Sequence, residues 1–406
     1  MGLDVERVRQ DFPILQRKKP PVYLDNACVT LRPRQVVDKV REYYEEYPAC
    51  GGRSVHRLSQ RVDDEVHKAR VSLKRFINAK REREVLFRHN TTAGVNLVAR
   101  SFPFQKGDVI LVSDKEHNSN LLPWQVAARK QGLKLDVVDS ADDNSFSMDN
   151  FRQKLEEHDG DVSMVALGHM SNLDGATIPA RDVVKESHLH GAKVFLDAAQ
   201  SAPHKELDVR QLKADFVAFS GHKMLGPSGT GVLYGPEEEL LSLDVNDVGG
   251  ETVEDATYQD ATWEGLPHRF EAGLQHYAGI IGLGEASSYL KRVGLGDVER
   301  HERGLNEAMT EGLDGMEGVD IIGPEDPGKR GGIASFTVEG MSSHDVAMML
   351  SGARDVMIRS GTHCVHSWFD KHGLQGTARA SAYLYNSLSD VQVFLDEVKE
   401  ALRLRR

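Results

Sequence analysis

The feature that most constrains this chain is a repeated alternation of short apolar runs with longer segments of helical spacing. The helical segments include residues 123–131, 149–157 and 180–190. Strands that alternate with helices predict βαβ units and a mainly parallel sheet. The clearest strand candidates are residues 84–87, 108–112, 163–167, 193–196 and 215–219.

The pattern changes after Arg269, and residues 323–332, rich in Gly, Pro and charge, are predicted to form a loop. We therefore expect an α/β protein, with a large domain built on the parallel sheet and a smaller C-terminal α+β domain. A helix at residues 5–12 could pack on either domain. Further helices are predicted at residues 277–293, 305–313 and 390–404. The expected division is an N-terminal arm at 1–20, the large domain at 21–295 and the small domain at 296–406.

The composition excludes several classes of protein. The 406 residues carry 50 Lys and Arg against 62 Asp and Glu, a net charge of −12, so nucleic acid is not expected as a partner. No stretch approaches the ~18 consecutive apolar residues of a membrane span, so no membrane partner is expected. The three cysteines Cys28, Cys50 and Cys364 are an odd and sparse set, and residues 1–6 lack the pattern of a signal peptide. We therefore expect a cytoplasmic protein.

The residues that follow the predicted strands indicate where a ligand binds, because open parallel sheets bind ligands beyond the carboxyl ends of their strands. The first strand candidate is followed by Asn90-Thr91-Thr92, which suits a phosphate at a helix N-terminus but also suits an ordinary helix cap. His117 follows the second candidate and could simply be a surface histidine. Asn172 follows the third, where it could form a turn.

The last two strand candidates are followed by ionisable groups. Asp197 comes directly after an apolar run, where a carboxylate is costly unless it is paired, and Gln200 follows it. Lys223 lies in the turn Ser220-Gly221-His222-Lys223. The five strand ends together predict an aromatic cofactor with a phosphate, an acid for a ring nitrogen and an amine. Pyridoxal 5′-phosphate fits this set, since a lysine amine forms its Schiff base and an aspartate keeps its ring nitrogen protonated.

Several motifs resemble one known family. Residues 197–200 (Asp-Ala-Ala-Gln) and 220–223 (Ser-Gly-His-Lys) closely resemble the class V aminotransferase superfamily of fold type I pyridoxal phosphate enzymes. Residues 269–273 and 379–381 add to this resemblance, which runs from Tyr23 to Asn386. The stretch 359–364 (Arg-Ser-Gly-Thr-His-Cys) is similar to the second group of cysteine desulfurases.

The resemblance implies a role in cofactor or substrate binding for each of eleven side chains. Lys223 would bond to the cofactor and carry protons, Asp197 would pair with the ring nitrogen, and His117 would stack on the ring and assist proton transfer. Arg379 would bind the substrate carboxylate through a bidentate fork, aided by Arg359. The other implied contacts are Asn172 and Gln200 to the ring hydroxyl, and Thr91, Thr92, Ser220 and His222 to the phosphate.

The same resemblance implies a cysteine desulfurase that converts L-cysteine to L-alanine. Cys364 would attack the substrate sulfur as a thiolate, hold it as a persulfide and pass it to an acceptor protein or cluster scaffold, as in iron-sulfur cluster assembly. A homodimer is also implied. Selenocysteine lyase, kynureninase-like and epimerase relatives remain alternatives with the same cofactor, and a non-catalytic sulfur carrier is a third possibility. A metal site formed by His363, Cys364, His366 and His372 is disfavoured, because no second cluster of ligands is obvious; no metal is expected.

The chain departs from the family pattern at a few positions. Leu274 replaces a threonine that in relatives is thought to reach the phosphate of the neighbouring subunit, and Ala93 stands where glutamate is usual. Asn118 follows His117 where a second histidine is frequent. Ser367 stands where a proline commonly follows the cysteine loop. Cys28 replaces an alanine near the expected substrate position, where it could be a small buried hydrophobe.

Overall fold

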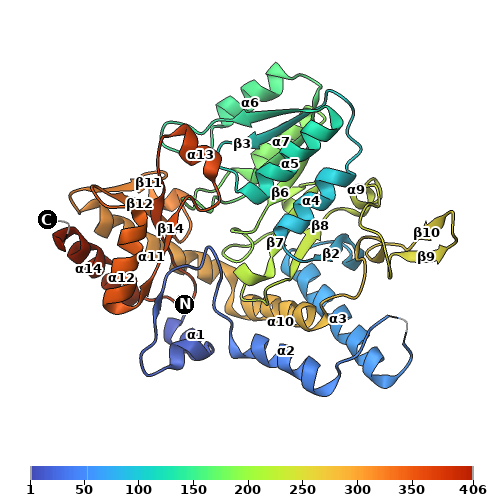
Figure 1. The fold of residues 1–406 in the computed structure, drawn as a ribbon, viewed down its shortest axis with the longest axis horizontal. Coiled ribbons are helices and arrows are strands. Elements are labelled where there is room, and N and C mark those ends of the chain that lie inside the picture. The colour runs from blue at the N-terminus through green and yellow to red at the C-terminus, as the bar shows by residue number, and fades with distance from the viewer. Residues whose placement is uncertain (1, 53, 405–406) are drawn as a thin grey trace.

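The computed structural model describes residues 2–52 and 54–404, and it contains two main sheets (Figure 1). The larger sheet has seven strands in the order β2-β8-β7-β6-β5-β3-β4. β8 is antiparallel to both its neighbours, while the other strands run in one direction. The mainly parallel sheet expected from the sequence is confirmed. Its strands are β2 (Val85–Arg88), β3 (Val109–Ser113), β4 (Lys134–Val138), β5 (Val162–Gly168), β6 (Lys193–Asp197), β7 (Phe216–Ser220) and β8 (Gly231–Tyr234).

Helices cover both faces of this sheet because successive strand side chains point to opposite faces. Ile110 and Val112 of β3 pack with α4 and α5 on one face, and Val109 and Leu111 pack with helices on the other. The helices of the first face are α4 (Thr91–Ser101), α5 (Asn118–Gln131) and α9 (Glu237–Leu241). Those of the second are α3 (Arg57–Phe76), α6 (Met148–Glu157), α7 (Ala180–Leu189) and α10 (Tyr277–Val293).

The smaller sheet has four strands in the order β11-β12-β15-β14, and all its pairs are antiparallel. It shares a core with helices α11, α12 and α14. Leu24 also lies in this core, and β1 pairs with β13, so the segment before Asp25 packs with the C-terminal part of the chain. The bounds are β1 (Val22–Tyr23), β11 (Val319–Ile322), β12 (Ile333–Val338), β13 (Val356–Met357), β14 (Arg359–Gly361), β15 (Thr377–Ser381), α11 (Leu295–Asp314), α12 (Ser343–Arg354), α13 (His366–Lys371) and α14 (Leu388–Leu404).

Further elements lie outside the two sheets, among them the short helix α8 (Val209–Leu212). Helix α1 (Val5–Gln10) contacts both parts of the chain: Val8 packs in the core of the large sheet, and Arg9 pairs with Asp390 of α14 at 2.8 Å. Helix α2 (Arg34–Glu46) packs against α10. The hairpin of β9 (Val253–Ala256) and β10 (Ala261–Trp263) projects away from the body (Figure 1).

The structure corrects two predicted helix boundaries. The helix expected at residues 123–131 begins at Asn118, because His117 caps it: the ring Nδ1 accepts a hydrogen bond from the Ser119 N–H at 3.0 Å. The helix expected at residues 305–313 begins at Leu295, directly after Gly294, whose φ of 92° separates it from α10. Across the described residues, no helix has the length and apolar character needed to cross a membrane.

Candidate active site

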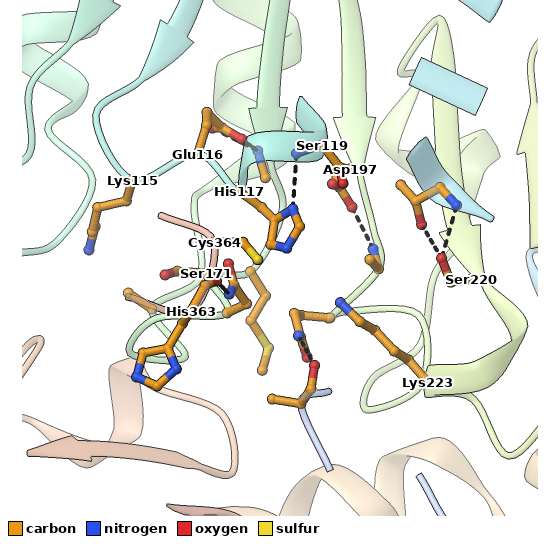
Figure 2. Close-up of a pocket in the computed structure, with 18 of the residues that line it drawn as sticks. Lys115, Glu116, His117, Ser119, Ser171, Asp197, Ser220, Lys223, His363 and Cys364 are labelled. Carbon is orange, nitrogen blue, oxygen red and sulfur yellow. Dashed lines mark hydrogen bonds between the residues drawn. The ribbon is translucent and has the colours of Figure 1, made fainter. Parts of the chain in front are cut away.

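The carboxyl ends of the parallel strands meet at a cavity of about 240 Å³. Short segments from the smaller sheet close its other side, so the cavity lies between the two parts of the chain (Figure 2). Every side chain that the sequence assigned to a site lines this cavity. These residues are Thr91, Thr92, His117, Asn172, Asp197, Gln200, Ser220, His222, Lys223, Arg359, Cys364 and Arg379.

Lys223 lies in the 3₁₀ turn Gly221–Lys223 that follows β7, and its side chain extends into the cavity (Figure 2). Burial lowers the pKa of its amine, while the nearby Asp197 carboxylate opposes that shift. A buried amine whose neutral form is favoured is suited to nucleophilic attack on a carbonyl carbon.

Asp197 ends β6 and is buried, with 7% of its surface exposed. Its Oδ1 accepts a hydrogen bond from the Ala199 N–H at 2.8 Å. Burial raises the pKa of the carboxyl, although this hydrogen bond and the charge of Lys223 act in the opposite direction. A buried carboxylate of this kind needs a positively charged partner in the cavity, and a protonated ring nitrogen would provide it.

His117 presents its ring to the same space (Figure 2). Burial and the charge of Lys223 lower its pKa to about 3, so the imidazole is neutral at physiological pH. Because Nδ1 accepts from the Ser119 N–H, the ring proton is assigned to Nε2. The capping hydrogen bond therefore determines both the orientation and the tautomer of this side chain.

The N-terminus of α4 forms the part of the cavity that suits an anion. Asn90 caps this helix, and the Thr91 N–H donates to Oγ of Ser220 at 2.9 Å. The Thr91 and Ser220 hydroxyls are 2.7 Å apart, whereas the Thr92 hydroxyl donates to Ser119. Hydroxyls and a helix N-terminus thus converge where the sequence expected a phosphate.

Two amide side chains connect this region to the rest of the cavity. Gln200 donates from Nε2 to the Ala27 carbonyl at 2.8 Å, while its buried Oε1 has no hydrogen-bond partner among the described residues. Asn172 donates from Nδ2 to the carbonyl of His363 at 2.7 Å. The sequence did not predict this second contact, which ties the loop carrying Cys364 to the large sheet.

Cys364 lies between β14 and α13, in a loop whose backbone is held in place. His363 and Cys364 have φ values of 49° and 60°, in the left-handed region that costs energy for residues other than glycine. The Cys364 carbonyl accepts a hydrogen bond from the Asn118 N–H at 2.7 Å, and the Asn118 amide contacts Nδ1 of His366 at 2.9 Å. These contacts hold the loop, and Cys364 lines the cavity.

Two arginines line the side of the cavity formed by the smaller sheet. Arg379 is 2% exposed; its Nη1 donates to the Asn172 carbonyl at 2.7 Å, and its Nη2 lies 3.5 Å from Oδ1 of Asp25. Its buried Nε has no partner among the described side chains and backbone groups. Arg359 is more exposed and donates from Nη1 to Sγ of Cys28 at 3.1 Å.

Two charged residues of the cavity had no predicted role. Glu116 accepts from the Ser113 hydroxyl at 2.6 Å, and burial raises its pKa to about 7. Lys115 forms a buried ion pair with Asp174 at 2.8 Å. Both residues lie just before His117 in the chain. Lys115 connects this loop to the loop after β5, and Glu116 connects it to the end of β5 by accepting from the Gly168 N–H at 3.0 Å. The available sequence signal was that Glu116 lies in the short segment after the predicted strand at residues 108–112.

The structure offers no support for a metal in the cysteine loop. His363 contacts Thr377 through Nε2, at 2.8 Å from its Oγ1, and the ring of His372 stacks on Trp368 with centroids 4.1 Å apart. No group of three or more His, Cys, Asp or Glu side chains is placed to bind a metal ion anywhere in the described part of the chain.

The donors in the cavity fit pyridoxal phosphate. Lys223 would bond to the cofactor, and Asp197 would face its ring nitrogen. The unpaired Gln200 Oε1 is a free acceptor beside them, and Thr91 and Ser220 would hold the phosphate. The fold and this cavity define a pyridoxal-phosphate enzyme of fold type I.

Comparison with known proteins gives the family. The model of the aminotransferase class-V family matches residues 22–394, and the chain belongs to this family. It is 36% identical to a probable cysteine desulfurase of Halalkalibacterium halodurans over 410 residues, which covers 98% of each chain.

Two solved structures of cysteine desulfurases are also similar to this chain over nearly its whole length. The apo structure of a cysteine desulfurase from Thermococcus onnurineus NA1 is 39% identical, has a TM-score of 0.94 and covers 99% of each chain. The cysteine desulfurase CsdA from Escherichia coli, in an S-sulfonic acid form, is 31% identical with a TM-score of 0.91 and full coverage of both chains.

Acid is expected to destabilise the fold because buried imidazoles must stay uncharged in it. Burial lowers the pKa of His117, His169 and His363 from 6.5 to about 3. The unfolded chain therefore binds protons below pH 6.5 that the native chain does not. The stability from these neutral imidazoles is complete above that pH and falls as the pH drops toward 3, by up to about 1.4 kcal/mol per pH unit for each ring.

Denaturant unfolding at about pH 7.5 and about pH 5 measures this loss. His169→Gln should reduce the difference between the two pH values. His344→Gln, which changes an exposed histidine of α12, is the control and should leave the difference unchanged. Equal stability of the wild-type protein at both pH values would contradict the expectation.

Proposed function

We propose that this protein is a pyridoxal-phosphate-dependent cysteine desulfurase that converts L-cysteine to L-alanine and holds the sulfur as a persulfide on Cys364. The observation that carries the proposal is the position of the Cys364 thiol in one cavity with Lys223, Asp197 and Arg379. The names of the full-length relatives support the same activity.

When bound, pyridoxal phosphate supplies an aldehyde that condenses with amines and a ring that accepts the electron pair released at the substrate Cα. Lys223 holds the cofactor and moves the Cα proton. Asp197 keeps the ring nitrogen protonated, and neutral His117 assists proton transfer from Nε2. The Cys364 thiolate then attacks the substrate sulfur: an S–S bond forms, and the bond between that sulfur and the substrate Cβ breaks. The electron pair stays on the carbon fragment, which takes up a proton at Cβ and is released as alanine, and the persulfide is left on the enzyme.

The reaction itself tests this proposal. Incubation of the holoenzyme with L-cysteine and a thiol reductant should release alanine and sulfide in equal amounts. Without the reductant, mass spectrometry should find added sulfur on Cys364. Alanine without sulfide, or turnover of selenocysteine or kynurenine alone, would favour the alternative relatives instead.

Substrate recognition is expected to depend on the planar fork of Arg379. Arg379→Lys should lower kcat/KM for L-cysteine by about 10- to 150-fold, because a point charge loses the paired charge-assisted hydrogen bonds, worth about 1.5–3 kcal/mol. Steady-state kinetics measures the loss, and denaturant unfolding checks the fold. Arg354→Lys, an exposed position on α12, is the control. Kinetic constants within about twofold of wild type at position 379 would contradict carboxylate binding there.

We also propose that the protein acts as a cytoplasmic homodimer that passes sulfur to an acceptor protein or cluster scaffold. Leu274 is 73% exposed and Tyr258 of the β9–β10 turn is fully exposed, and exposed apolar side chains of this kind support contact with a partner subunit. The Gln275 amide donates to the Ala272 and Gly273 carbonyls, both at 3.1 Å, so it is engaged locally. Sedimentation equilibrium tests the dimer. The free cysteines support a reducing compartment.

A further inference from the structure

Cys28 is a second thiol in the cavity, and the proposed reaction does not use it. It lies shortly after β1, is partly buried, and lines the cavity together with Cys364. Nη1 of Arg359 donates a hydrogen bond to its Sγ at 3.1 Å. Cys50 is exposed and does not line the cavity. Two of the three cysteines therefore share one reaction space.

The cavity around Cys28 contains the cationic side chains of Arg359, Arg379 and Lys223, and the Asp25 carboxylate pairs with Arg359 at 3.9 Å and with Arg379 at 3.5 Å. Burial lowers the pKa of both Lys223 and Arg379, and a negative charge on Cys28 acts against that shift in each case. A charge on Cys364 has the same effect on Lys223. Both sulfur atoms are thus within electrostatic reach of the same amine. The hydrogen bond from Arg359 places a charged donor on the Cys28 sulfur, a setting typical of reactive thiols.

We propose that Cys28 is a second sulfur-accepting thiol, which takes the outer sulfur atom of the Cys364 persulfide. The inference rests on the proposed function, because Cys364 must be charged first. The Cys28 thiolate attacks the outer sulfur and forms a new S–S bond. The bond between that sulfur and Cys364 Sγ breaks, and Cys364 leaves as a thiolate. One persulfide replaces another, so no oxidant or reductant is needed.

The geometry favours transfer inside the cavity. Hydrogen bonds from Asn118 and Asn172 hold the backbone of the Cys364 loop, and both thiols line the same cavity. The outer sulfur extends about 2.05 Å beyond Sγ, the length of an S–S bond. Arg359 stabilises the charge on the receiving sulfur through its contact with Cys28. Transfer frees Cys364 for a second turnover, so each chain stores sulfur at two positions.

The test is the distribution of added sulfur after the holoenzyme reacts with L-cysteine in the absence of reductant and acceptor. Samples are alkylated at intervals, digested and analysed by mass spectrometry. In the wild type, added sulfur should be found first on Cys364 and later on Cys28, and not on Cys50. The total should be about twofold that of Cys28→Ser, which is charged on Cys364 alone. Cys364→Ser should carry none, and Cys50→Ser should match the wild type.

The wild-type distribution decides the proposal even where a variant misfolds. Added sulfur on Cys364 alone would overturn it, as would equal labelling of Cys28 and Cys50. A disulfide between Cys28 and Cys364, formed with release of sulfide, would also overturn it. Charging of Cys28 in Cys364→Ser would mean that Cys28 attacks the substrate directly, which overturns the transfer step. Absence of added sulfur from Cys364 in the wild type would overturn the proposed function together with this inference.

Discussion

Lys223→Ala is expected to lower kcat for L-cysteine by about 10²- to 10⁴-fold, the range that a positioned proton-transfer group supplies. The Lys223 amine extends into the cavity (Figure 2), and burial lowers its pKa. A lower pKa favours the neutral amine, which is the form that can take up a proton. Alanine removes both the covalent attachment of the cofactor and this proton carrier. The fold should persist, because removing a buried amine relieves a desolvation cost.

The visible absorbance of the lysine-bound cofactor measures the loss directly, and denaturant unfolding checks the fold. Lys223→Arg is the matched variant: it keeps the positive charge but is expected to lose the absorbance and the activity as well. If either variant kept the absorbance of the wild-type holoenzyme, the assignment of Lys223 would be wrong.

Cys364→Ser is expected to lower sulfide release by at least about two orders of magnitude, because a serine hydroxyl stays protonated at neutral pH and is a far weaker nucleophile than a thiolate. The backbone contacts of the loop involve the carbonyls of His363 and Cys364 rather than the thiol. Serine should therefore preserve the loop and the cofactor site. The variant should still bind cofactor and L-cysteine, with a changed absorbance on addition of the substrate.

Sulfide release and alanine formation are measured together for this variant. Cys50→Ser, which removes an exposed thiol away from the cavity, should behave as the wild type. Undiminished desulfuration by Cys364→Ser would remove its nucleophilic role and favour a lyase that needs no thiol.

The charges in the cavity fit these two expectations. Burial lowers the pKa of Lys223 and raises the pKa of Asp197. The charge of each group partly offsets the shift in the pKa of the other. A cofactor with a cationic ring would take over this role opposite Asp197. The neutral His117 adds no further positive charge, since its pKa is lowered to about 3.

Much of the large sheet could be predicted from the sequence because its signals are local. A short apolar run bounded by polar residues indicates a buried strand, and each of the five predicted runs overlaps a strand of the larger sheet. The limits of α5 and α11 could not be predicted from apolar spacing, since α5 begins at a cap formed by the His117 ring and α11 at the positive φ of Gly294.

The sequence by itself determined where the strands of the large sheet lie and which ionisable residues follow them. Because parallel strands end at one edge of a sheet, it also predicted that Asp197, Lys223 and His117 meet there. Only the tertiary structure decided how the cysteine loop is held and that Cys28 lies against Arg359, a residue 331 positions away in the chain. The physical reason is that such contacts depend on how the smaller sheet packs over the larger one. No local periodicity or turn signal carries that information.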